Sequence, residues 1–327
     1  MSPHAGRLNR DASTFGIIPG MTAHVDQTEP VVAAFEWQTL TLILGTYGAW
    51  FALTSAYTDW PWYVVLPLLV VIVTLHSSLQ HEAIHGHPTR NARINGALVM
   101  LPLSLWLPYA IYRSEHLTHH RDERLTDPID DPESYYWTAE AWQRLNPVAR
   151  VMFTAQQTLA GRILIGSWWR IGRFLRIQFL SALRNDPDKR FIWAQHALLC
   201  VPLILWLMLV CELPLWLYVV AVVIPGHGLL LIRSFAEHRA RPIMRQRVAI
   251  VEGSRLLGPL FLFNNLHALH HAAPGIPWYR YNAVYRRTRT QLMELNDGLV
   301  YKTYLDVARR YLFRAHDSPQ HPQGRVP

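Results

Sequence analysis

The sequence predicts an all-α integral membrane protein, with four transmembrane helices in two hairpins and a cytoplasmic helical cap that carries clustered histidines. Hydrophobic residues make up 50% of the 327 residues and charged residues only 17%, below the roughly 25% usual for soluble proteins. Lysine and arginine are absent from two long stretches, residues 11–89 and 191–232. Many of the 17 histidines gather just after apolar segments.

Four apolar stretches are each long enough to cross a bilayer as a helix, which takes about 20 apolar residues. They lie near residues 31–57, 61–80, 191–210 and 213–232. The short linkers "TDWP" and "CELP" join them into two hairpins. A fifth apolar segment, 94–112, contains Pro102 and Pro108, which interrupt a helix. We therefore interpret it as a re-entrant or interfacial segment rather than as a span.

The basic residues set the expected orientation. All 31 lysines and arginines lie in three blocks, before residue 11, from 90 to 190, and from 233 onward. Neither hairpin linker carries one, so the positive-inside rule places every block in the cytoplasm. We expect a cytoplasmic N-terminal segment (1–30), a membrane domain (31–290), and a cytoplasmic C-terminal helix with a flexible tail (291–327). The net charge of +8 reflects this membrane pattern, and no nucleic-acid partner is expected.

The clustered histidines are the main functional signal. The clusters are His81, His85 and His87; His116, His119 and His120; and His267, His270 and His271, with His238 as a further single candidate. Residues three and four apart share a helix face, so each cluster can aim its imidazoles at one point. The first cluster and His238 follow spans, the second cluster follows the interfacial segment, and the third lies on the tail beyond the last span, all on the predicted cytoplasmic side. Without His87 they supply nine imidazoles, which suit two ions of Fe, Cu, Zn or Ni rather than one tetrahedral zinc.

Two other classes of protein share parts of this pattern. His81-Glu82-x-x-His85 matches the H-E-x-x-H motif of zinc metallopeptidases. Intramembrane zinc peptidases usually add an Asp from a later apolar helix, whereas the only acid of the second hairpin is Glu212, in its linker. A metal transporter would place its site near the bilayer midplane, but these clusters lie at the ends of spans. The peptidase remains a remote alternative, and O2 dependence would separate an enzyme from a transporter.

Three further residues are candidates for groups that orient the metal ligands. Glu82 is expected to accept a hydrogen bond from a ligand imidazole. His87 is expected to lie just outside the ligand set, with a tenth ligand or a surface residue as the alternatives. Asn265, directly before the last cluster, is a candidate for holding a bridging water, with a simple helix cap as the equal alternative. The acidic run 122–133 lacks the order of a calcium loop, and we expect it to be solvated. We also expect His316 and His321 to be exposed.

The motifs "HEAIH", "HLTHH" and "HALHH" together resemble the integral-membrane fatty acid desaturases and the related hydroxylases and ketolases. The resemblance covers residues 30–290, and "NNLHALHH" and "HEAIHGHP" look most like a bacterial branch of the family. It implies a di-iron centre on the cytoplasmic face, in a bacterial inner membrane. The implied ligands, which are catalytic through the metal, are His81, His85, His116, His119, His120, His267, His270 and His271, and His238 occupies the place of an additional ligand.

The resemblance also implies the reaction and its partners. O2 would be the co-substrate, and the product would be a double bond in a fatty acyl chain. Hydroxylation or ketolation of a lipid or carotenoid is the alternative that the motifs leave open. The substrate would be an acyl lipid or an acyl thioester. Cys200 and Cys211 are too few for an iron–sulfur site, so a separate ferredoxin-type or cytochrome-type electron donor is expected.

Overall fold

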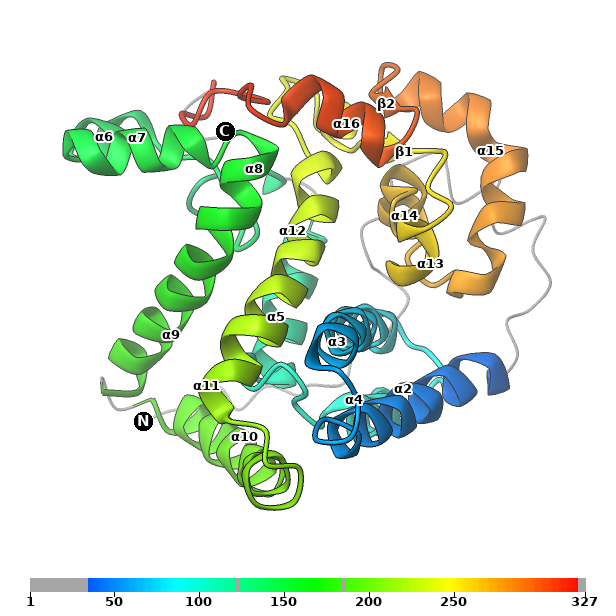
Figure 1. The fold of residues 1–327 in the computed structure, drawn as a ribbon. Helices are drawn as coiled ribbons and strands as arrows, with labels where there is room; N and C mark the ends of the chain where they lie inside the picture. Colours follow the sequence, from blue (N-terminus) through cyan, green and yellow to red (C-terminus); the bar gives the residue numbers. More distant parts are fainter. Residues whose placement is uncertain (1–34, 122–123, 184–185, 323–327) are drawn as a thin grey trace, which may run out of the picture.

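The computed structural model describes residues 35–121, 124–183 and 186–322. The fold is built from helices, and its one parallel sheet within these ranges pairs β1 (Ile250–Val251) with β2 (Val300–Tyr301). The membrane-type helices are α2 (Trp37–Ser55), α3 (Trp62–Ile84), α10 (Pro187–Leu205) with η3 (Trp206–Val210), and α11 (Leu215–Tyr218) with η4 (Val219–Val223) and α12 (Ile224–Glu237). In Figure 1, α12 lies between α3 on one side and α9 (Ser167–Leu183) on the other.

Within the described ranges, three helices are long and apolar enough to cross a bilayer: Trp62–Ile84, Pro187–Val210 and Leu215–Glu237. They correspond to three of the four predicted spans. The fourth, near residues 31–57, forms helix α2 from Trp37 but is not among them. Threonines on α2 bond to its own backbone, as Thr46 does to the Leu42 carbonyl at 2.7 Å. This polar content lowers the hydropathy of α2, so a four-span membrane domain is not confirmed.

The two hairpins share one apolar core, in which polar groups are paired. Trp50 of α2 and Tyr218 of α11 are both fully buried there. The Trp50 indole donates to the Tyr218 hydroxyl at 2.8 Å, and that hydroxyl donates to the Leu103 carbonyl at 2.6 Å. Unpaired polar groups are costly in such surroundings. Tyr218 therefore joins the first hairpin, the second hairpin and the segment between them.

Replacement of Tyr218 by phenylalanine is expected to destabilise the protein without changing its metal content. The change leaves the Trp50 N–H and the Leu103 carbonyl without their partner, at a cost of about 1–3 kcal/mol. Thermal unfolding in detergent measures this effect. Tyr57→Phe, on the rim of the same core, is the matched control and should leave the melting temperature within about one degree.

The segment predicted to be interfacial is not one continuous helix. Asn91 caps α4 (Ala92–Val99) by accepting hydrogen bonds from the Arg93 and Ile94 backbones. The chain then runs without a helix until Pro108, which directly precedes α5 (Tyr109–His119). Pro102 lies in the non-helical part, in keeping with the expected effect of both prolines. The break lets α5 start in a new direction and bring its histidines under α3.

Beyond the spans, smaller elements form a cap around the ends of α3, α5 and α12. They are α6 (Ala139–Gln143), α7 (Pro147–Ala155), α8 (Leu159–Gly161), η2 (Arg162–Gly166), η5 (Met244–Arg247), α13 (Leu257–Leu260), α14 (His267–Ala272), η6 (Trp278–Arg280), α15 (Tyr281–Leu295) and α16 (Tyr304–Tyr311). A buried cluster that includes Leu269, Tyr281 and Val284 packs α14 against α15. This packing fixes the short α14, which is too short to be stable alone.

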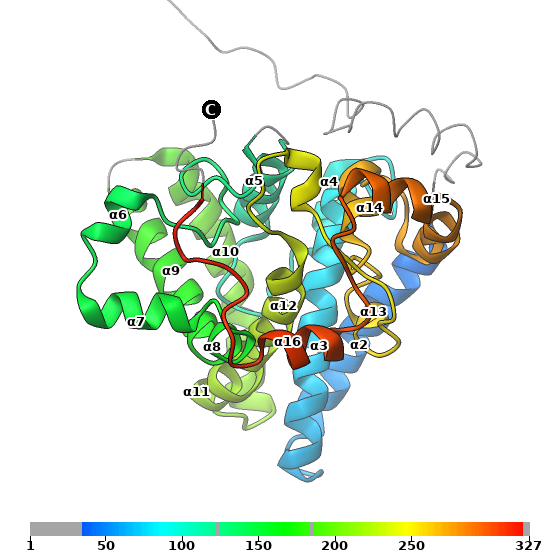
Figure 2. The ribbon, with the colours of Figure 1, turned by 90° about the horizontal axis from the view of Figure 1, so that it is seen from above.

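The end of the chain packs on the cap as a strap, residues 312–322. Figure 2 shows it leaving α16 and passing beside α8. His316 and His321 are only 6% and 5% exposed, so the expectation that they are solvent-exposed is wrong. The tail expected to be flexible has defined contacts as far as His321, whose backbone N–H donates to the Trp137 carbonyl at 3.0 Å.

Candidate metal centre

Four helices deliver histidines to one place, and three of them do so at their C-terminal ends. His81 lies in the last turn of α3 and His85 caps it; His116 and His119 lie in the last turn of α5, and His120 caps it. His238 directly follows α12. Helix C-termini carry partial negative charge, which favours a cation. The third group of histidines comes from α14, so long-range packing places all four elements around one point.

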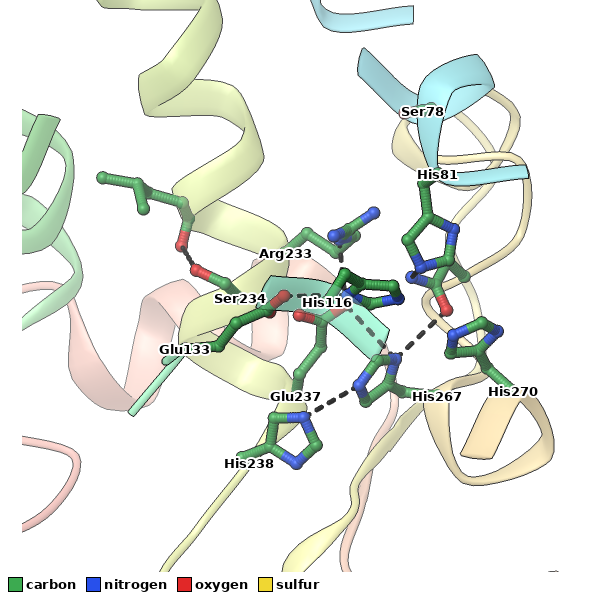
Figure 3. A network of polar contacts seen from close by, with 12 residues as sticks. Ser78, His81, His116, Glu133, Arg233, Ser234, Glu237, His238, His267 and His270 are labelled. Atoms are coloured by element: carbon green, nitrogen blue, oxygen red, sulfur yellow. Dashed lines mark hydrogen bonds and ion pairs between the residues drawn. The ribbon is translucent and has the colours of Figure 1, made fainter. Parts of the chain in front are cut away.

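The nine histidines form two groups, each with its candidate ligand atoms within 4.8 Å of one another. The first cluster is His81, His85, His116, His120 and His270, and the second cluster is His119, His238, His267 and His271. Both draw on α5 and α14, so the two clusters adjoin. His87 is in neither. Figure 3 shows His238 directed at His267 in the second cluster and Glu133 directed at His116 in the first.

The spacing of the imidazole nitrogens tests whether metal ions fit. Nε2 of His85 lies 2.9 Å from Nε2 of His116, and Nε2 of His120 lies 2.9 Å from that of His270. In the second cluster, Nε2 of His238 lies 3.1 Å from that of His119. Where both rings carry their proton on Nδ1, the facing Nε2 lone pairs cannot hydrogen-bond each other, and a cation between them would remove their repulsion. The donor sets fit two metal ions of imidazole-binding type.

Groups behind the imidazoles fix which nitrogen faces inward. Nδ1 of His116 donates to Glu133 at 2.8 Å, and Nδ1 of His119 donates to Asp131 at 2.9 Å. The corresponding partners of His267 and His270 are the Asn264 amide oxygen at 3.1 Å and the Tyr281 hydroxyl at 3.0 Å. An Nδ1 that donates leaves the Nε2 lone pair free for a metal, and a carboxylate partner raises ligand basicity.

Burial and charge act together on the protonation of the site. Burial, with help from neighbouring imidazoles, holds the pKa of His120 well below its usual value, so this ring is neutral and able to bind a metal. Burial raises the pKa of Glu133, but His119 and His116 outweigh it and hold that pKa well below its usual range. Burial lowers the pKa of His119, but Asp131 and Glu133 outweigh it and raise that pKa to about 9, so a metal ion that binds its Nε2 would displace a proton from that nitrogen.

A comparison with protein families now identifies the chain. The model of the family described as fatty acid desaturase matches residues 58–303, about three quarters of the sequence. The chain belongs to the fatty acid desaturase family. The matched range contains all nine clustered histidines and the carboxylates of Asp131, Glu133 and Glu237 that contact them. No curated protein sequence matches this desaturase-family chain.

The three residues expected to orient the ligands have other contacts in this desaturase-family protein. His87 donates from Nδ1 to Glu36 at 2.6 Å, and both side chains are buried. Glu82 accepts from the Trp278 backbone N–H at 3.2 Å. Asn265 donates to the Val251 carbonyl at 2.6 Å. None of these hydrogen bonds reaches a clustered imidazole.

Two of the groups that contact the ligands, Asp131 and Glu133, come from the acidic run that was expected to be solvated. Asp131 is only 7% exposed, and its second oxygen accepts from the Thr126 backbone N–H at 2.8 Å. For Asp131 and Glu133 the expectation of a solvated loop is therefore wrong. Their sequence signal was their position shortly after the second histidine cluster. Asn264 was missed because Asn264 and Asn265 both directly precede the third histidine cluster, and the sequence does not show which of the two contacts it.

A cavity of about 110 Å³ adjoins the first cluster and is named here the α12 cavity. Its apolar lining includes Val73, Leu107, Phe174, Val223, Leu230 and Leu231, and its polar lining includes Tyr112, Glu133 and Arg233. The buried polar residue His227, 9% exposed, also lines it. Glu133 thus contacts both the cavity and His116. An apolar group in this cavity would lie next to Glu133, which hydrogen-bonds His116.

Replacement of Glu133 by glutamine is expected to weaken metal binding about 10–100-fold, because the neutral amide is a poorer acceptor for the His116 N–H. Glu140→Gln is the matched control, since Glu140 lies in the first turn of α6 away from both clusters. Chelator-competition titration of each purified variant measures the affinity. Equal metal affinity in Glu133→Gln and the native protein would show that this contact has no role in holding the ligand.

Proposed function

We propose that this chain is a membrane di-iron, O2-dependent oxidoreductase that introduces a double bond into a fatty acyl chain. The observation that carries the proposal is the pair of adjoining histidine clusters beside the apolar α12 cavity. Family membership supports the reaction class. His81, His85, His116, His120 and His270 would hold one iron, and His119, His238, His267 and His271 the other.

Iron bound there would supply the oxidising power to remove hydrogen from an unactivated acyl carbon, with O2 and an external electron donor as co-reactants. The chain's own residues would do the rest. Val73, Val223 and Leu231 would hold the acyl chain and exclude water from its reacting carbons. Glu133 and Asp131 would keep the protons of His116 and His119 on Nδ1, away from the metal side of each ring.

The membrane arrangement is part of the same proposal. Helix α2 would complete the first hairpin by packing along α3, although its composition is less apolar than that of the other three helices. The absence of basic residues from both hairpin linkers supports a cytoplasmic position for the clusters and both termini, and the membrane of this proposal is a bacterial inner membrane. A separate ferredoxin-type or cytochrome-type donor would deliver electrons from that side.

The contacts of the H-E-x-x-H segment count against a zinc peptidase. His81 and His85 adjoin three further imidazoles in the first cluster, more than a catalytic zinc site uses. A peptidase would also need the Glu82 carboxylate to activate a water, but this carboxylate accepts a backbone N–H of Trp278 at 3.2 Å.

The test combines the metal content of the detergent-purified protein with lipid analysis of a host that expresses it with a ferredoxin and its reductase. About two irons per chain together with new double bonds in acyl lipids, formed only under O2, are expected. Hydroxylated or oxygenated lipids would show instead that the reaction is the hydroxylation or ketolation named above as the alternative. One zinc per chain and unchanged lipids would contradict the proposal.

A further inference from the structure

The α12 cavity contains a buried nitrogen that lacks a hydrogen-bond partner. Nε2 of His227 lines this cavity and has no such partner within the described part of the chain. The side chain is only 9% exposed, and it lies in the helix Leu215–Glu237, which is long and apolar enough to cross a bilayer. It belongs to neither histidine cluster. An ionisable side chain at such a place is costly and is typical of a functional site.

The glycines on either side of His227, in the motif "PGHG", fix the helix that carries it. Gly226 approaches α3: a Cβ added there would lie 3.5 Å from Oγ1 of Thr74, and that hydroxyl donates to the Gly226 carbonyl at 3.2 Å. Gly228 approaches η2, where a Cβ would lie 3.3 Å from the Ile163 side chain. Figure 1 shows α12 held in this way between α3 and α9. The packing on both sides leaves the imidazole on the face of α12 that lines the cavity.

The surroundings of His227 select the class of group that it can bind. The Trp106 ring lies with its centroid 5.1 Å from that of the imidazole, and Val223 and Leu230 also line the cavity. These apolar side chains favour a neutral group, because a charged one would lose its hydration there. A neutral imidazole presents either a lone pair or an N–H at Nε2, and a hydroxyl complements both forms. A carbonyl oxygen complements the N–H form only.

The position of His227 along α12 separates such a hydroxyl from the metal centre. His227 and Arg233 both line the cavity from α12, and about 9 Å of helix lies between them. Glu133 also lines the cavity and accepts from His116 of the first cluster at 2.8 Å. A group bonded to His227 would therefore lie several methylenes away from the part of the chain beside the first cluster.

A plain hydrocarbon chain would leave this nitrogen without a partner. The cavity, at about 110 Å³, has room for water, which can bond to His227 when no chain is bound. A chain that displaces such water must replace its hydrogen bond or lose affinity. A site built to hydrogen-bond a substrate hydroxyl discriminates strongly against the analogue that lacks it, because its own buried polar group is then unpaired.

We infer that His227 hydrogen-bonds a hydroxyl group on the acyl chain of the substrate, several methylenes away from the carbons that react. This rests on the proposed function and narrows its substrate class to hydroxylated acyl chains. His227 is then a residue that determines substrate specificity without contacting the metal centre. A reaction that hydroxylates an acyl chain must precede this one and supply its substrate.

The test measures binding to the full-length protein as purified in detergent, without O2 so that no turnover occurs. A scintillation proximity assay with tritiated octadecanoic acid gives dissociation constants by competition. The competitors are unlabelled octadecanoic acid and the positional series of hydroxyoctadecanoic acids. At least one hydroxy isomer is expected to bind about 10-fold more tightly than the plain acid, because its hydroxyl pairs a buried group that the plain chain leaves unpaired. Isomers with the hydroxyl far from that position are expected to bind no better than the plain acid.

Variants connect that preference to His227. His227→Phe keeps a ring of similar shape without a hydrogen-bonding nitrogen and is expected to remove the preference. His227→Gln keeps a donor and an acceptor and should retain part of it. His76→Phe is the matched control, because His76 is also buried in a span but bonds to the Tyr47 hydroxyl and does not line the α12 cavity. If His227→Phe does not fold, His227→Leu and the native comparison still decide.

Three results would overturn the inference: no hydroxy isomer that binds more tightly than the plain acid, an undiminished preference in His227→Phe, or the same loss of preference in His76→Phe. Host lipid analysis separates this failure from that of the proposed function. New double bonds without any hydroxyl preference would leave the function standing and reject the role of His227. A hydroxyl preference that depends on His227, without oxidised lipids, would leave the site standing and reject the desaturase reaction.

Discussion

Replacement of His120 by alanine is expected to abolish acyl oxidation and to reduce bound iron to about half or less. His120 is 2% exposed, and its Nε2 lies 2.9 Å from that of His270 in the first cluster. Removing only a partner behind a ligand costs about 10–100-fold in affinity, and loss of the ligand itself costs more. The cavity left by the ring would also admit water next to the remaining imidazoles.

Iron analysis and turnover with O2 and a reductase check this result together. His76→Gln is the matched control, because His76 is equally buried but hydrogen-bonds to the Tyr47 hydroxyl at 3.1 Å and belongs to neither cluster. The control should keep its iron. Comparable activity in His120→Ala and His76→Gln would contradict the assignment of the first cluster as an iron site.

The nine clustered histidines could be predicted from the sequence because two local features identify them. Spacings of three and four put His267, His270 and His271 on one helix face, and α14 does carry them in that order. The second feature is position, since each cluster follows a predicted span or the interfacial segment. His238 belongs to no sequence motif, and it was selected as a candidate ligand by its position directly after the last predicted span. The structure brings it into the second cluster.

The residues that support the histidines could not be predicted, because long-range contacts define them. Asp131 looks like any acid in an acidic loop, and only the packing of that loop against α5 brings it to His119. His321 looks like a tail residue, and only docking of the strap buries it. Helix α2 is a different case, because the sequence predicted a helix in this range and the structure has one. Its threonines and aromatic residues lower its hydropathy, and it is not among the three helices apolar enough to cross a bilayer.

Removal of strap residues 316–322, by ending the chain after Ala315, is expected to lower metal affinity at least as much as Glu133→Gln does. The strap holds the loop that carries Asp131 and Glu133, which contact His119 and His116. The Trp137 backbone N–H donates to the Pro319 carbonyl at 2.9 Å, and the Tyr136 hydroxyl donates to Asp317 at 2.8 Å. His321 contacts the Thr126 hydroxyl at 3.2 Å. Each such bond contributes about 0.5–1.5 kcal/mol.

A continuous set of contacts carries the effect to the metal centre. His321 touches Thr126, the backbone of Thr126 donates to Asp131 at 2.8 Å, and Asp131 accepts from His119 at 2.9 Å. Without the strap, the loop that carries Asp131 and Glu133 has more conformational entropy. Metal binding must then order this loop, and the lost entropy lowers the metal affinity. The expected loss in affinity is therefore about 10–100-fold, and the absorption spectrum of the cobalt-substituted protein should change with it.

Two comparisons show whether the strap acts through these carboxylates. A chain ending after Pro322 keeps every contact named above and should bind metal like the native protein. A chain ending after Ala315 that also carries Glu133→Gln and Asp131→Asn should bind little worse than the full-length double variant, because the two changes remove the same support. Fully additive losses would mean instead that the strap stabilises the cap by a route independent of His116 and His119.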